Sequence, residues 1–178
     1  MIHYYCEKNE LKRGTDGSAG YDLVCDNGTE KDMNHAIATD GSISLEPGSR
    51  LLVNTNLYLA MPRGVAGMVC SRSGLAINSG VVVLNAPGII DSDYRGEVKV
   101  CLANLGNRRY VVHPGDRVAQ IVFTHYIVEL RSSVVDNEPV QSYGMDGILL
   151  ERVGTFEDWS ERFGGTPRGA GGHGSTGR

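Results

Sequence analysis

The chain has 178 residues, and this length fits one domain with its own hydrophobic core, since about 100 to 150 residues is the commonest domain size. Its net charge of -4 and its pI of about 5.7 exclude an overall basic field, so we expect no stable nucleic-acid binding and no attraction to an anionic membrane. The sequence contains neither an apolar targeting segment at its start nor an apolar run long enough to span a membrane. We therefore expect an intracellular, cytoplasmic protein or, if the gene is viral, one of the host cytoplasm or nucleus.

Short runs of Val, Ile, Leu and Tyr, separated by turn formers such as Pro62-Arg63-Gly64, predict strands along most of the chain. These runs lie at 2–6, 50–53, 57–61, 65–70, 81–84, 98–103, 109–112 and 117–123. Many short strands with regular turns predict an all-β barrel or sandwich.

Helix signals are few. Residues 73–78 predict one or two helical turns, and 155–163 predict a helix with Thr155 as its N-cap and acidic residues in its first turn. The polar segment 25–42 and the segment 131–167, which lacks a clear period, are typical of insertions or mobile surface. The four cysteines show no Cys-x-x-Cys pairing, and we expect core residues rather than a metal or redox site.

The densest group of reactive side chains lies between residues 69 and 100. Ser71-Arg72-Ser73-Gly74 combines a guanidinium, two hydroxyls and a glycine at an expected helix start, which suits an anion, although taken alone the segment is better explained as a capped surface turn. Two apolar residues lead directly into Asp91, which predicts a carboxylate at the edge of a buried strand. Such a group can act as a general base; the alternative is a turn-forming aspartate in a hairpin.

The last residues, RGAGGHGSTGR, contain a GxGxxG pattern and lie one lysine short of a P-loop. Both patterns need a following helix whose N-terminus binds the phosphate, and the sequence stops four residues after the pattern. A segment so rich in glycine cannot build a core, so we expect it to be disordered unless something binds it.

Five segments in this order resemble the motifs of the homotrimeric dUTPases, the dUTP pyrophosphatases. They are AGYDL (19–23), SRSGLA (71–76), GIIDSDYRG (88–96), GDRVAQ (115–120) and RGAGGHGSTG (168–177). The resemblance implies a jelly-roll-like β domain over residues 1–165, with extended segments at 25–42 and 124–167. It also implies a flexible arm over 166–178 that is exchanged within a homotrimer.

The resemblance further implies Mg²⁺-dependent hydrolysis of dUTP to dUMP and diphosphate, with Asp91 as the base that activates water for attack on the α-phosphorus. Tyr94 would pack under the deoxyribose and exclude a 2′-hydroxyl. The uracil edge would be read by Asn85 and by the backbone of Gly88, Ile89 and Ile90. Lys99 matches a substrate-contacting position in some members, and a solvated strand lysine remains an open alternative.

The same resemblance assigns the phosphates to Arg72, Ser73, Gly74 and Gln120. Asp22 would meet Mg²⁺ through the metal's waters, as suits an ion that keeps most of its hydration. The arm would add Arg168 on phosphate, His173 on uracil, and Gly174 and Ser175 around the phosphates.

Three features depart from the usual family pattern. Ser71 replaces the more common proline or alanine, His173 replaces a phenylalanine, and segments 25–42 and 124–167 are long enough to contact a protein partner. Two alternatives stay open. A dCTP deaminase of the same fold uses a glutamate where this chain has Cys101, and a non-catalytic nucleotide sensor would keep the pocket but lose the base, whereas Asp91 is present.

Overall fold

The computed structural model of the chain describes residues 1–26, 38–126 and 150–166. Most elements in this part of the chain are strands, as the sequence predicts. The strands are β1 (Ile2–Cys6), β2 (Tyr21–Val24), β3 (Ile43–Leu45), β4 (Arg50–Val53), β5 (Leu57–Ala60), β6 (Val65–Cys70), β7 (Val81–Val83), β8 (Gly88–Ile90), β9 (Val100–Asn104), β10 (Tyr110–Val112), β11 (Arg117–His125) and β12 (Leu150–Arg152). The helices are α1 (Ser73–Ser79) and α2 (Phe156–Phe163).

The predicted runs correspond to β1, β4, β5, β6, β7, β9, β10 and β11. The short strand β8 corresponds to the buried strand expected before Asp91. The sequence pattern misses β2, β3 and β12, whose three or four residues include polar or charged side chains such as Asp22, Ser44 and Glu151. A short strand without a continuous apolar run carries no local signal, and it is defined by the strand with which it pairs. Within the segment 131–167, β12 pairs in parallel with β1.

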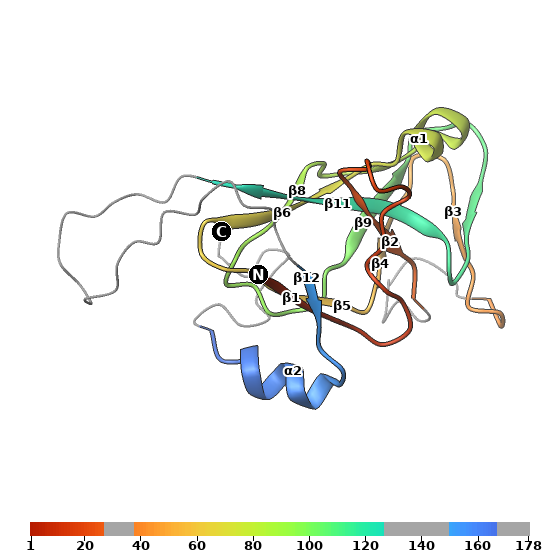
Figure 1. The fold of residues 1–178 in the computed structure, drawn as a ribbon. Coiled ribbons are helices and arrows are strands. Elements are labelled where there is room, and N and C mark those ends of the chain that lie inside the picture. Colours follow the sequence, from red (N-terminus) through yellow and green to blue (C-terminus); the bar gives the residue numbers. More distant parts are fainter. Residues whose placement is uncertain (27–37, 127–149, 167–178) are drawn as a thin grey trace, which may run out of the picture.

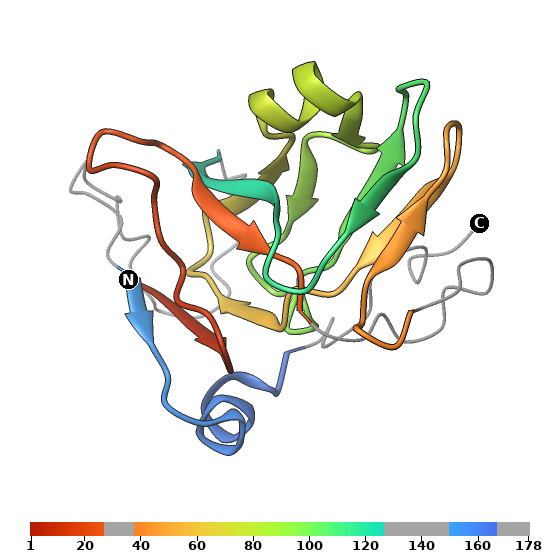
Figure 2. The same cartoon turned by 90° about the vertical axis from the view of Figure 1, so that its right-hand side faces the viewer.

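The strands form four small sheets around a common interior, a jelly-roll-like all-β fold (Figures 1 and 2). The sheet orders are β2-β11-β6-β8, β4-β9-β7, β12-β1-β5 and β10-β3. Leu51, Leu59, Leu102 and Ile121 are fully buried in this interior. Each such side chain stabilises the fold by roughly 1.5 to 3 kcal/mol relative to an exposed one, so the interior fixes the sheets against one another.

The two helices lie on opposite sides of the strands (Figure 2), and both confirm the sequence prediction. Helix α1 ends at Gly80, whose φ of 68° requires glycine, and a Cβ there would lie 2.5 Å from the backbone nitrogen of Gly106. Helix α2 begins at Thr155, whose side chain accepts a hydrogen bond from the backbone N–H of Asp158. Neither of these described helices is long and apolar enough to cross a membrane.

All four cysteines are reduced, as expected. Cys6 and Cys25 are buried in the core, and Cys70 and Cys101 are half-buried. Burial raises the pKa of both Cys6 and Cys25, that of Cys25 to about 11, so these thiols stay protonated at neutral pH. In the described residues no cluster of His, Cys, Asp and Glu could hold a metal ion.

Candidate active site

Strand β8 places Asp91. It pairs antiparallel with β6, so that Gly88 lies opposite Val69 and Ile90 opposite Gly67. Asp91 follows at once, is half-buried, and accepts a hydrogen bond at its carbonyl from the N–H of Tyr94 at 3.1 Å. The carboxylate therefore stands where a strand enters a tight turn, which combines the two alternatives that the sequence left open.

A hollow of about 580 Å³ opens beside this turn. Its floor includes Asp91, and the hydroxyls of Ser92 and Tyr126 lie 3.2 Å apart at its edge. The lining residues are Met61, Arg63, Asp91, Ser92, Asp93, Arg95 and Tyr126. Asp91 thus lines a hollow that is large enough for water and substrate oxygens.

Tyr94 is held in place by its own turn. Its side chain is 8% exposed, and its hydroxyl donates a hydrogen bond to the Glu97 carbonyl at 2.9 Å. A Cβ on Gly96 would lie 2.4 Å from this hydroxyl oxygen and 2.7 Å from the ring carbon that carries it. The ring can occupy this position only because residue 96 is glycine, and burial raises the pKa of the phenol above its ordinary value.

The uracil-reading residues expected from the sequence lie along the same hairpin. Asn85 is exposed in the turn before β8, and a Cβ on Gly88 would lie 3.2 Å from its side-chain nitrogen. Gly88 itself is buried, Ile90 packs against the core, and Ile89 is 54% exposed. Ile89 therefore presents an apolar side chain outward from the hairpin.

Lys99 is partly buried between the core residues Val98 and Val100. Its ammonium lies 3.7 Å from Glu97, whose carboxylate accepts hydrogen bonds from the N–H groups of Thr55 and Asn56. The structure therefore gives Lys99 an ion pair with a structural carboxylate. Lys99 lies directly before β9, so both interpretations of this residue remain predictions.

A second group of candidate residues forms a row across three strands. Asp22 on β2 lies opposite Gln120 on β11, and Gln120 lies opposite Cys70 on β6. Arg72 follows two residues after Cys70. The register of one sheet thus collects three of the sequence motifs at one place.

Asp22 is the centre of this row. One of its carboxylate oxygens lies 3.2 Å from Nε of Arg72, and the other accepts a hydrogen bond from Nη1 of Arg117 at 3.2 Å. Arg72 also donates to the Arg117 carbonyl at 2.9 Å. Two guanidiniums around one carboxylate leave a net positive charge, and their planar donors suit a phosphate.

Gln120 has a fixed position in the row. Its Nε2 donates to the Ser71 carbonyl at 3.0 Å, and its Oε1 lies so close to Gly20 that a Cβ there would approach within 2.3 Å. The close approach explains physically why the segment AGYDL has glycine before the tyrosine.

Ser73 and Gly74 begin α1 and are exposed. The N-cap position is Arg72, and it makes no side-chain cap hydrogen bond. The hydroxyl of Ser71 instead accepts from the N–H of Val83 at 2.9 Å. The capped-turn alternative is therefore wrong for this segment.

The structure does not bring the two groups together within one chain. Asp91 lies beyond Ile90, next to the beginning of β6, whereas Arg72 lies beyond its end. Six residue steps along an extended strand separate these levels by roughly 20 Å. Figure 1 shows the same separation between the end of β8 and helix α1. A ligand bound to one copy of the described chain can therefore contact either the Asp91 turn or the row that contains Arg72, but not both.

Asp22 was also expected to act on Mg²⁺, and its surroundings fit only an indirect role. Both of its oxygens face guanidiniums, so it is not arranged as one of several direct ligands. Mg²⁺ usually keeps several waters and binds chiefly to substrate phosphates. The remaining candidates, Arg168, His173, Gly174 and Ser175, lie outside the described residues.

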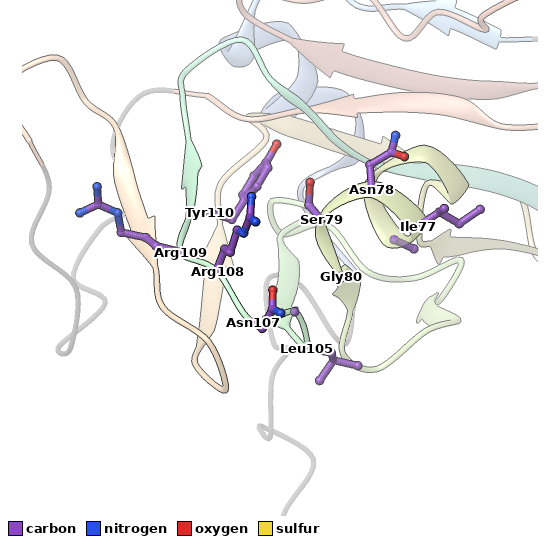
Figure 3. Close-up of a pocket in the computed structure, with 11 residues that line it drawn as sticks. Ile77, Asn78, Ser79, Gly80, Leu105, Asn107, Arg108, Arg109 and Tyr110 are labelled. Atoms are coloured by element: carbon purple, nitrogen blue, oxygen red, sulfur yellow. The ribbon is translucent and has the colours of Figure 1, made fainter.

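A hollow of about 690 Å³ between the end of α1 and the turn from β9 to β10 was not expected (Figure 3). Arg108 extends beside Tyr110 in it, whereas Arg109 points away. The buried side chain of Asn104 shapes its wall by donating to the carbonyls of Leu45 and Arg108 at 2.8 Å each.

The comparisons with known proteins agree with this geometry. The dUTPase family model matches residues 7–146. A deoxyuridine 5'-triphosphate nucleotidohydrolase of Mesorhizobium japonicum is 42% identical over 146 residues, which cover 82% of this chain and 74% of that protein. The protein of the same name from Wolbachia pipientis of Culex pipiens is 54% identical over 92 residues, 52% of this chain and 60% of that protein. The chain thus spans less than two thirds of the latter relative.

Solved structures show the same fold. A mutant dUTPase from phage phi11 of S. aureus, described as coordinating a structural Mg(II) ion, matches with a TM-score of 0.60 at 18% identity over 77% of this chain and 98% of that one. The native EIAV dUTPase matches with a TM-score of 0.58 at 22% identity over 78% of this chain and 99% of that one. The fold is a jelly-roll-like all-β domain. The chain belongs to the dUTPase family.

Proposed function

We propose that the protein hydrolyses dUTP to dUMP and diphosphate with Asp91 as the general base. The observation that carries the proposal is the position of Asp91, a half-buried residue that lines a hollow directly after β8. The carboxylate accepts a proton from water, and the water oxygen bonds to the α-phosphorus. The bond from the α-phosphorus to the bridging oxygen breaks, and diphosphate leaves.

The hairpin around β8 is proposed to bind the nucleoside. Asn85 and the backbone of Gly88, Ile89 and Ile90 read the uracil, because a wrong base would leave polar groups unpaired. The packing of Tyr94 against Gly96 supports a rigid platform under the deoxyribose. A ribose 2′-hydroxyl would meet the ring, so UTP is rejected by steric contact.

The row on β2, β11 and β6 is proposed to bind the triphosphate. Arg72, Ser73, Gly74 and Gln120 supply the donors, and Asp22 orients Arg72 through the ion pair described above. When bound, Mg²⁺ would neutralise charge on the triphosphate, with Asp22 contacting it through water. Lys99 is proposed to act on substrate only indirectly, through Glu97.

Because Asp91 and Arg72 lie at opposite ends of β6, the proposal requires more than one copy of the chain at each site. A homotrimer with shared sites satisfies this requirement, with the turn of one subunit facing the row of another. The arm over 166–178 would complete the site through Arg168, His173, Gly174 and Ser175. Segments 25–42 and 124–167 remain candidate contacts for a protein partner, and the proposal places the enzyme in the cytoplasm.

The arm has its own test. A chain truncated after Thr166 keeps α2 and every described contact, so it should remain folded and trimeric while dUTP hydrolysis nearly disappears. Size-exclusion chromatography and a diphosphate assay on the same sample measure both properties. Full activity of the truncated trimer would remove the arm from the site.

The proposed reaction is tested by comparing nucleotides. Diphosphate release from dUTP, dCTP, dTTP and UTP is measured with Mg²⁺, and ammonia is assayed in parallel. We expect release from dUTP alone. Ammonia from dCTP would favour the deaminase of the same fold, which is disfavoured here because the half-buried Cys101 stands where that enzyme needs a glutamate. Binding of dUTP without release would favour a nucleotide sensor.

A further inference from the structure

Arg95 connects the Asp91 turn to helix α2. Its Nη1 donates to the carbonyls of Ser92 and Tyr94 at 2.7 and 2.9 Å, and its Nε donates to the carbonyl of Phe163 at 2.9 Å. The side chain is half-buried, and burial lowers the pKa of the guanidinium, although arginine remains charged. One cation thus binds two carbonyls of the catalytic turn and one at the end of a helix.

Thr166 makes a second, independent connection. Its hydroxyl donates to the carbonyl of Asp93 at 2.7 Å. Residues 163–166 are therefore bonded to residues 92–95 at two points, although about 70 residues separate them in sequence.

Helix α2 is firmly seated on the strands. Trp159 is 1% exposed and packs with Ala60 and Val153, and the Phe163 ring lies 5.1 Å from the Trp159 ring and stacks on His3 at 4.9 Å. The carbonyl of Phe163 is one of the last helix carbonyls, which lack a partner within the helix, and a cation there is favourable. The end of α2 is thus a fixed point to which the turn can be attached.

We infer that Arg95 and Thr166 are positioning residues for Asp91, which hold the turn after β8 against the end of α2. This inference rests on the proposed function. Within the turn, the N–H of Tyr94 donates to the Asp91 carbonyl, and the contacts of Arg95 and Thr166 attach this turn to α2. Small displacements of a catalytic group are costly, so bonds that fix the turn should act on turnover more than on substrate binding.

The test compares Thr166→Val, which removes the donor at nearly constant size, with Thr166→Ser, which keeps it. Arg95→Lys keeps the charge but loses the fork of donors. The matched controls are Thr39→Val at an exposed turn residue and Arg50→Lys at the exposed first residue of β4. For each full-length variant kcat and KM for dUTP, the melting temperature, and amide exchange at Tyr94 are measured.

We expect Thr166→Val to lower kcat roughly three- to tenfold with KM changed less than about twofold, since one hydrogen bond is lost and the bound state is unaffected. Thr166→Ser should restore kcat, and Arg95→Lys should lower it about tenfold or more because several bonds are lost. Exchange at Tyr94 should accelerate in Thr166→Val and Arg95→Lys. Both controls should match the parent protein.

Unchanged kcat in both Thr166→Val and Arg95→Lys would overturn the inference. A rise in KM at constant kcat would also overturn it, because it would place these contacts in substrate binding. If the parent protein releases no diphosphate from dUTP, the proposed function fails separately. Amide exchange at Tyr94 then tests whether Arg95 and Thr166 hold the turn in place. An exchange rate that is unchanged in both variants would contradict the inference.

Discussion

Asp22 on β2 and Arg72, two residues beyond the end of β6, form an ion pair at 3.2 Å, although β11 lies between these two strands. The pair is partly exposed, at 19% for Asp22 and 29% for Arg72, so it contributes about 1 kcal/mol or less to stability. The ion pair matters mainly for orientation, because it fixes the direction of the Arg72 guanidinium before any ligand binds. A phosphate that takes the place of the Asp22 carboxylate in this pair finds the guanidinium donors of Arg72 already in position.

The first prediction concerns Asp22→Asn. We expect KM for dUTP to rise about tenfold and the dependence on Mg²⁺ to weaken, because Arg72 loses its orienting charge. The melting temperature should change little. Steady-state assays at several Mg²⁺ concentrations measure the effect, with the exposed Asp16→Asn as control. Parent-like kinetics in Asp22→Asn would show that the pair is only structural.

The second prediction concerns the platform under the sugar. Gly96→Ala places a methyl group 2.4 Å from the hydroxyl oxygen of Tyr94, so the ring must move. We expect kcat/KM for dUTP to fall and the discrimination against UTP to narrow. Gly17→Ala is the matched control, because a Cβ at Gly17 meets no atom within 4 Å. Unaltered dUTP and UTP kinetics in Gly96→Ala would contradict a sugar-contacting role for Tyr94.

The third prediction concerns pH and the core. Burial raises the pKa of Cys25 to about 11 from its ordinary value of 9.0, and the nearby carboxylates of Asp116 and Asp26 add to this shift. The folded protein holds the proton more tightly than the unfolded chain, so this stability is fully present below pH 9.0 and is lost as the pH rises through about 11. In this pH range, the free energy of unfolding measured with urea should fall less steeply with pH in Cys25→Ala than in the parent protein. The two slopes should differ by at most about 1.4 kcal/mol per pH unit. Equal slopes would contradict it.

Strands with several alternating residues and both helices could be predicted from the sequence. Thr155, for example, carries its cap signal locally, and the structure shows the corresponding hydrogen bond. Strand β12 could not be predicted in this way, because Glu151 and Arg152 give it no apolar pattern and it becomes a strand only through pairing with β1. Local pattern therefore predicts the apolar strands, whether long or short, and tertiary pairing defines the polar ones.

The candidate site, too, could be predicted only in part from the sequence. The motif segments containing Asp22, Arg72 and Gln120 were visible in the sequence, but their alignment in one row depends on the register of β2, β11 and β6. The contacts of Arg95 and Thr166 join residues about 70 positions apart. A sequence carries no local signal for such a contact, so neither residue was expected at the site.

The central claim is that Asp91 activates the attacking water, and Asp91→Asn tests it most directly. In a single-turnover experiment with dUTP and Mg²⁺, we expect diphosphate release to fall roughly 100- to 10,000-fold while dUTP still binds. Glu46→Gln, an exposed carboxylate in the turn before β4, is the control and should retain parent activity. Near-normal release in Asp91→Asn would contradict the account.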